Sequence, residues 1–331
     1  MLESIVRKKH PTNPRLARVL CQLLLQLKPS DPVTVQLCID TLGSSKVQKL
    51  LTKPKPDIQN RLACFDTGHQ PIANQRLKIA ICMSGETRSF GNTAASILRF
   101  FNGHDVRIFA HHWSDDPMQT PMDTGDLTLV SEDRPDFSTL ERAAITAFGM
   151  KSYKNSVKIP LFSPNLFPMW YGVKQAFNSI TTPDDFDLIA RCRYDDLLIG
   201  HTNLLSQLPT SNEIIIDPAY NGYGGYGDQF AIGTPPAMRR YCHLFDWLPE
   251  AIEQYAGADR FFPEVVLKTY LEEVCDLEVR EINLGLRLLR DEFIGMEPHL
   301  IPLRSHHFSQ QRNAGLSDYI RAKHPDLYEN S

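Results

Sequence analysis

The sequence predicts an α/β domain with a mostly parallel central sheet, preceded by a small all-α segment. Two observations predict this class. Short apolar runs alternate with stretches of helical periodicity from residue 77 onward, whereas the first fifty or so residues show helical periodicity alone. We therefore divide the chain into a helical N-terminal segment over 1–52, a linker over 53–76 and a main domain over 77–331.

The composition narrows the class of protein. With 331 residues and 42% hydrophobic content, the chain can bury a large core. Lys and Arg total 35 against 39 Asp and Glu, so no general attraction to nucleic acid is expected. The 7 cysteines form no C-x-x-C pair, which favours reduced, buried thiols. No apolar leader and no stretch of ~20 apolar residues occurs, so we expect a cytoplasmic protein, with peripheral contact at the inner face of the membrane left open.

The N-terminal segment has the pattern of packed helices. Asn13 can cap a helix that begins at Pro14, and apolar residues then recur at helical spacing up to Leu27. A second start follows at Ser30. Two interpretations stay open: a structural cap on the main domain, or a module that docks a partner protein or a membrane surface.

Strands and helices alternate in the main domain, as expected for a parallel sheet covered on both faces. The expected strands are 77–83, 105–111, 157–160, 186–192, 213–216 and 229–232. The expected helices are 92–101, 138–148 and 168–180, followed by a helical region over 236–274. Residues 115–135 are rich in Asp, Pro, Thr and Gly and predict a long loop, and an irregular charged tail is expected from Asp291 onward.

The first strand ends in a turn suited to an anion. Ser84, Gly85 and Arg88 lie between this strand and a helix, where backbone N–H groups and the helix N-terminus meet. We interpret the turn as a contact for a nucleotide or phosphate. A plain strand-to-helix turn is the alternative, since glycine is common at this place in α/β proteins.

A second concentration of charge follows the strand 186–192. Arg191, Arg193, Asp195 and Asp196 fall within six positions at the carboxyl end of this strand, where open α/β sheets bind ligands. Carboxylates there can hold Mg²⁺ or Mn²⁺ against a diphosphate, because such hard ions prefer oxygen ligands. The alternative is a polar strand end with Arg193 and Asp196 paired at the surface.

Four motifs, in order, resemble GT-A type nucleotide-sugar glycosyltransferases of bacterial glycan biosynthesis. They are Ser84-Gly85-Glu86-Thr87-Arg88, the strand from Asp105 to His111-His112-Trp113, Arg193-Tyr194-Asp195, and Gly227-Asp228-Gln229-Phe230-Ala231-Ile232-Gly233. The resemblance covers about residues 77–310. It implies a Rossmann-like GT-A domain, a nucleotide-sugar donor, and a glycan, lipid-linked or protein acceptor.

The resemblance also implies a metal site of Mn²⁺ or Mg²⁺ with the donor's diphosphate. Asp195 stands at the last position of the family's Asp-x-Asp motif, but Arg193 occupies the first position. Two options follow: Asp196 helps to hold the metal, or Arg193 binds the diphosphate directly. In related enzymes a C-terminal histidine completes the metal shell, and His307, or its neighbour His306, is the candidate here.

Asp228 is the candidate catalytic base or acceptor-binding carboxylate. It follows a run of glycines and tyrosines that lets the chain approach a sugar, and glycosyl transfer needs a base for the acceptor hydroxyl. Capping of a strand after a flexible loop is the alternative. The resemblance further places His111, Trp170 and Tyr171 around the nucleotide, although core packing also explains both aromatic residues. Competing functions are nucleotidyl or sulfuryl transfer, and a non-catalytic scaffold with a degenerate α/β domain.

Overall fold

A computed structural model describes residues 21, 38, 76–87, 89–116, 126–153, 157–199, 208–218, 224–258, 261–282, 284–289 and 308–329. The chain divides into two compact units, Met1–Asp66 and Thr67–Ser331. In the first unit the structure describes Cys21 and Cys38, both helical and buried. The rest of the predicted helical segment, and the predicted linker up to residue 75, lie outside the described residues.

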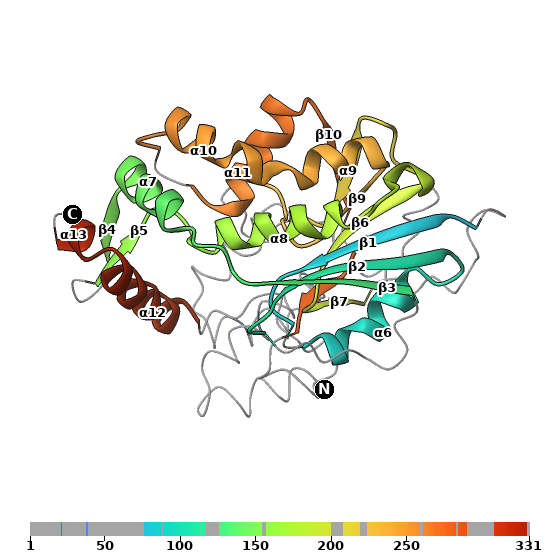
Figure 1. Ribbon diagram of the computed structural model, residues 1–331, viewed down its shortest axis with the longest axis horizontal. Helices are drawn as coiled ribbons and strands as arrows, with labels where there is room; N and C mark the ends of the chain where they lie inside the picture. Colours follow the sequence, from blue (N-terminus) through green and yellow to red (C-terminus); the bar gives the residue numbers. More distant parts are fainter. Residues whose placement is uncertain are drawn as a thin grey trace. The chain divides into compact units, whose positions relative to one another are not determined.

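A central sheet of seven strands organises the second unit (Figure 1). Its order is β10-β8-β9-β6-β1-β2-β3, and β9 alone among these strands runs antiparallel to its neighbours. The structure is therefore α/β with a mostly parallel sheet, as predicted. The strands are β1 (Lys78–Ser84), β2 (Asp105–Trp113), β3 (Asp126–Glu132), β6 (Leu188–Arg193), β8 (Glu213–Ile216), β9 (Ala231–Gly233) and β10 (Glu278–Glu281).

The central strand β1 shows why the sheet is covered on both faces. Ile79 and Ile81 belong to one apolar cluster, whereas Ala80 and Cys82 belong to another. Because successive side chains of a strand point to opposite faces, these two clusters lie on the two sides of the sheet. Apart from Lys78, every residue of β1 is buried, as expected for a central parallel strand.

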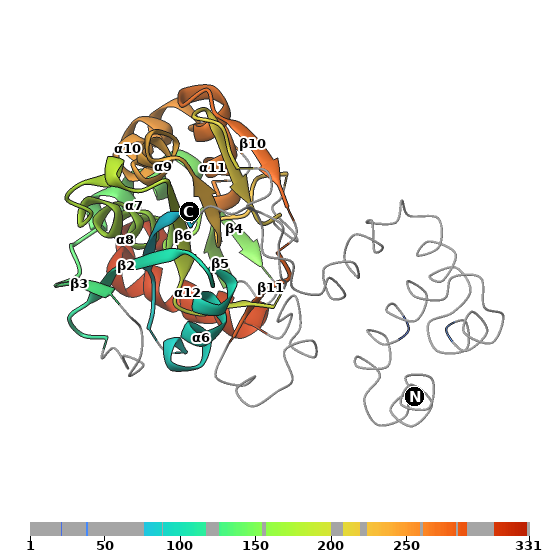
Figure 2. The same ribbon diagram turned by 90° about the vertical axis from the view of Figure 1, so that its right-hand side faces the viewer.

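Helices form the outer layers. The views in Figures 1 and 2 place α6 on one face of the sheet and α8, α9, α10 and α11 on the other. The helices are α6 (Phe90–Phe100), α7 (Ser138–Phe148), α8 (Leu166–Asn178), η2 (Pro183–Asp185), α9 (Pro235–Cys242), α10 (Leu244–Gln254), α11 (Pro263–Thr269), η4 (Tyr270–Val274), α12 (Phe308–Lys323) and α13 (Pro325–Glu329).

Two small antiparallel pairs lie outside the central sheet. β4 (Met150–Tyr153) pairs with β5 (Val157–Pro160), so the predicted strand 157–160 is present but belongs to a hairpin. β7 (Asp196–Leu198) pairs with β11 (Leu286–Leu288) just after β6 ends. The six described cysteines are free and buried, as predicted.

Two predictions of irregular structure are wrong. Asp126–Glu132, expected as part of a loop over 115–135, forms β3 at the edge of the sheet. An edge strand exposes many of its residues, so it lacks the continuous apolar run that marks a buried strand. Residues 308–329, expected as part of a charged tail, form α12 and α13. α12 buries Ile320 in the core and adds polar contacts from Tyr319 and Lys323 to Glu141 of α7, so its sequence lacks the long apolar stripe that marks most helices.

Candidate active site

Several of the predicted site residues lie at the edge of the sheet where the parallel strands end. β1 ends at Ser84, β2 at Trp113 and β6 at Arg193. Because β9 runs in the opposite direction, Asp228 precedes it at the same edge, and Ala231 of β9 pairs with Arg191 of β6. Ligands of open α/β sheets bind outside this edge.

The turn after β1 is fixed by a carboxylate. Gly85 has a φ of +122°, a conformation that favours glycine. The backbone N–H of Thr87 donates to Asp116 Oδ2 at 2.8 Å, and the Thr87 hydroxyl donates to Oδ1 at 3.0 Å. The turn thus binds the carboxylate of Asp116, a residue that the sequence analysis did not single out. Ser84 is buried, and Arg88 lies outside the described residues.

His111 is buried against helix α8. Its Nε2 is 2.7 Å from Glu132 Oε1. A Cβ added at Gly172 would lie 3.1 Å from His111 Nδ1 and 3.4 Å from Ser84 Cβ, so this glycine permits the close approach of α8. Burial lowers the pKa of His111, and Glu132 opposes that effect. Glu132 ends β3, the strand that sequence reasoning did not predict, and was therefore missed.

The two aromatic residues predicted at the nucleotide are packed among other rings. Trp170 is fully buried and meets the ring of Tyr241 edge-on at 5.4 Å. Tyr171 is partly buried, stacks on Trp113 at 6.0 Å and donates to Glu132 at 3.4 Å. The structure therefore places Trp170 in the core, the interpretation that residue type alone favours over the nucleotide contact implied by the resemblance.

Arg191 is a buried cation beneath the edge of the sheet. Its side chain is 1% exposed, and Nη1 donates to the backbone carbonyl of Gln229, the residue after Asp228. Its Nε has no hydrogen-bond partner among the described residues. Arg191 thus fixes the backbone next to Asp228, and its burial keeps it from direct contact with a ligand in solution.

Arg193 and Asp195 form a bidentate ion pair. Arg193 Nε donates to Asp195 Oδ1 at 2.8 Å, and Nη2 donates to Oδ2 at 3.2 Å. The side chains are 20% and 2% exposed, respectively. Fork-like pairing of this kind is the strongest form of the arginine–carboxylate interaction. The Arg193 side chain therefore pairs with Asp195, and not with Asp196 at the surface as the sequence-based alternative had it.

Asp196 is completely buried beside the same arginine. Its Oδ2 accepts the backbone N–H of Arg193 at 2.7 Å, and its Oδ1 has no hydrogen-bond partner among the described residues. Burial raises the pKa of Asp196 to about 8, and the charge of Asp195 adds to the rise. The side chain is therefore mostly protonated at neutral pH.

Asp228 completes a cluster of carboxylates around Arg193. Burial lowers the pKa of Arg193, but Asp195, Asp228 and Asp196 together raise it above its usual value, so the guanidinium stays charged. Asp228 itself is 8% exposed. The cluster brings together two segments, 193–196 and the residues just before β9, which are more than thirty positions apart in the sequence.

Tyr241 of α9 lies beneath this cluster and was missed by sequence reasoning. Its hydroxyl is buried and has no hydrogen-bond partner among the described residues. Burial raises the pKa of this hydroxyl, Arg191 opposes the rise, and Asp228 and Asp196 add to it. In the sequence, Tyr241 stands only as one residue of the predicted helical region over 236–274, shortly after the Gly227–Gly233 motif, and no stronger signal pointed to it.

The carboxylates of the cluster do not fit a divalent ion as they stand. Both oxygens of Asp195 face the Arg193 guanidinium, and Asp196 is fully buried. Within the described ranges, no group of three or more His, Cys, Asp or Glu side chains is arranged to hold a metal. His306 and His307 lie outside the described residues.

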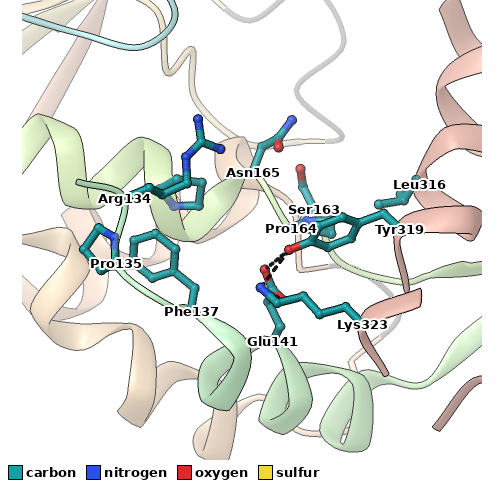
Figure 3. Close-up of a pocket in the computed structure, with 11 residues that line it drawn as sticks. Arg134, Pro135, Phe137, Glu141, Ser163, Pro164, Asn165, Leu316, Tyr319 and Lys323 are labelled. Atoms are coloured by element: carbon teal, nitrogen blue, oxygen red, sulfur yellow. Dashed lines mark hydrogen bonds and ion pairs between the residues drawn. The ribbon is translucent and has the colours of Figure 1, made fainter. Parts of the chain in front are cut away.

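A hollow of about 290 Å³ lies elsewhere, between α7, the start of α8 and α12 (Figure 3). Tyr319 and Lys323 of α12 point toward Glu141 of α7: the Tyr319 hydroxyl donates at 2.8 Å and Lys323 Nζ lies 3.0 Å away. His324 Nε2 contacts the same carboxylate at 3.1 Å. None of the predicted site residues lines this hollow, and its polar groups serve to dock the C-terminal helices.

No protein-family model matches the chain, and no curated protein sequence matches it either. Among the described helices, none has the length and apolar character needed to cross a membrane.

Proposed function

We propose that the chain is a GT-A type glycosyltransferase that moves a sugar from a nucleoside-diphosphate donor to an acceptor hydroxyl. The observation that carries the proposal is the cluster of Arg193, Asp195, Asp196 and Asp228 at the carboxyl edge of the sheet. The reversed strand β9 brings Asp228 to this edge. A mostly parallel sheet also agrees with what the resemblance of the four motifs implies.

In the proposed reaction the acceptor oxygen forms a bond to the anomeric carbon while the bond from that carbon to the diphosphate breaks. Asp228 takes the proton of the acceptor hydroxyl, and the nucleoside diphosphate leaves with the electron pair. Arg193 stabilises the charge that develops on the leaving diphosphate. Arg191 holds the backbone beside Asp228 through the Gln229 carbonyl and so keeps the base in position.

The competing transfer reactions have weaker support. Nucleotidyl and sulfuryl transferases need a lysine or an extended glycine-rich loop at the first turn. Here the N–H and hydroxyl of Thr87 already donate to Asp116, and residues 84–89 contain no lysine. We further propose a cytoplasmic site of action on a glycan, lipid-linked or protein acceptor, with the N-terminal segment as the contact to a membrane surface or a partner protein.

A thermal-shift panel tests the proposal. UDP, GDP, CMP and dTDP are each added with Mn²⁺ and, separately, with EDTA. We expect one nucleotide to raise the midpoint of unfolding, because a ligand at a hundred times its Kd stabilises the folded state by about 2.7 kcal/mol. No shift with any nucleotide under either condition would refute the transferase and leave the non-catalytic scaffold.

A further inference from the structure

We infer that Arg193 is the resident cation for the donor's diphosphate and that the site binds this group without Mn²⁺ or Mg²⁺. The inference rests on the proposed function, and it sharpens the choice between a metal and an arginine that the Asp-x-Asp comparison leaves open.

Asp195 is the only residue of the Asp-x-Asp pattern that is an aspartate here, and its carboxylate is already engaged. Its two oxygens lie 2.8 and 3.2 Å from Arg193 Nε and Nη2, and its side chain is 2% exposed. A metal ion bound to these oxygens would compete with the guanidinium for the same carboxylate and weaken the pair. Separating a buried ion pair leaves an uncompensated charge and is strongly unfavourable.

The charge next to Asp195 also opposes a metal ion. A divalent ion bound to this carboxylate would lie within a few ångströms of the Arg193 guanidinium, which carries the same sign of charge. Like charges a few ångströms apart repel, and the repulsion doubles when one of the two is divalent. Arg193 therefore disfavours the metal site that the Asp-x-Asp pattern would otherwise build.

Asp196 does not replace the missing ligand. Its side chain is completely buried, and Oδ2 is committed to the backbone N–H of Arg193. The second oxygen of Asp196 is thus a poor ligand for Mg²⁺, which demands near-ideal octahedral geometry.

The guanidinium itself suits a diphosphate. It has five N–H donors in a planar fork, and Asp195 accepts from two of its nitrogens, so further donors remain for phosphate oxygens. The side chain is 20% exposed, unlike the carboxylate that orients it. Arg191 lies two residues earlier on the same face of β6 and adds a second positive charge beneath the site.

The test compares binding of UDP, GDP and dTDP by isothermal titration in EDTA and in Mn²⁺. For the wild-type chain we expect the Kd of the nucleotide that binds to agree within about twofold between the two conditions. Arg193→Asp restores a carboxylate at the first position of the Asp-x-Asp pattern. This variant should bind at least tenfold more weakly in EDTA and recover in Mn²⁺, whereas Arg193→Gln should lose the same affinity and not recover.

Arg239→Asp is the matched control, because Arg239 is a 49% exposed arginine on the neighbouring helix α9. It should bind as the wild type does. A wild-type chain that binds its nucleotide only with Mn²⁺ overturns the inference and leaves the proposed function standing. If no nucleotide binds the wild type under either condition, the proposed function fails and the inference fails with it. The comparison of the wild-type Kd in EDTA and in Mn²⁺ tests the inference by itself, so the test still decides if Arg193→Asp fails to fold.

Discussion

Replacing Asp196 by asparagine should remove a strong pH dependence of stability. Asp196 is fully buried, and its pKa rises from the ordinary 3.8 to about 8 because burial disfavours the charged carboxylate and Asp195 repels it. The folded protein therefore holds this proton more tightly than the unfolded chain does. By linkage, the stabilisation is complete below about pH 4 and is lost as pH rises to about 8.

The magnitude follows from the size of the shift. Each pKa unit corresponds to about 1.4 kcal/mol, so a rise from 3.8 to about 8 corresponds to a loss on the order of 5 kcal/mol across this pH range. Asparagine is close to aspartate in shape and can keep the contact with the Arg193 N–H, but it does not titrate. The variant should therefore gain stability relative to the wild type as pH increases.

The assay is urea unfolding of both proteins at several values between about pH 5 and pH 9. The difference in free energy of unfolding should move in favour of Asp196→Asn by several kcal/mol over this interval. Asp184→Asn serves as the control, since Asp184 is 75% exposed, and its curve should stay parallel to that of the wild type. A constant difference between wild type and Asp196→Asn across this range would refute the reasoning.

Two further predictions concern the base and the C-terminal helices. Asp228→Asn should keep the nucleotide affinity within about threefold but lower the rate of sugar transfer at least a hundredfold, because general-base catalysis contributes about that much. The rate is measured as release of the nucleoside diphosphate in the presence of acceptor. Normal turnover in this variant would remove Asp228 from the mechanism. Glu141→Ala should lower the free energy of unfolding by about 2–4 kcal/mol in urea, because it leaves the groups of Tyr319, Lys323 and His324 without their buried acceptor. Arg142→Ala, one residue away on an exposed pair with Asp326, should cost less than about 1 kcal/mol, and equal losses in the two variants would contradict this account of the docking.

Much of the fold could be predicted because its central strands are buried on both faces. β1 is apolar from Ile79 to Met83, and β6 begins with the apolar residues Leu188, Ile189 and Ala190. Such runs identify a buried strand without knowledge of any contact. The edge strand β3 and the helix α12 could not be found this way. Strand β3 exposes most of its residues, so it has no continuous apolar run. Helix α12 is held in part by polar contacts to Glu141, which lies 167 positions before the helix begins.

Most of the charged residues of the candidate site could be predicted from the sequence, but their contacts with one another could not. The proximity of Arg193 and Asp195 follows from their spacing, but their ion pair depends on how the chain turns after β6. Glu132 was missed because its strand was missed. The burial of Trp170 agrees with the core packing that the sequence allowed, whereas the burial of Arg191 could not be predicted, because it depends on how the helices pack on β6. Sequence order alone does not say which charged residues face a ligand and which lie beneath it.

The central claim is that a nucleoside diphosphate binds at the carboxyl edge between β6 and β9. A crystal structure of the chain with the nucleotide that gives the largest thermal shift, grown in EDTA, tests it most directly. We predict the diphosphate within hydrogen-bonding distance of the Arg193 guanidinium, with Asp228 facing the space beyond it. A nucleotide bound instead in the hollow beside Glu141 and Tyr319, or bound at the edge without contact to Arg193, would contradict the account.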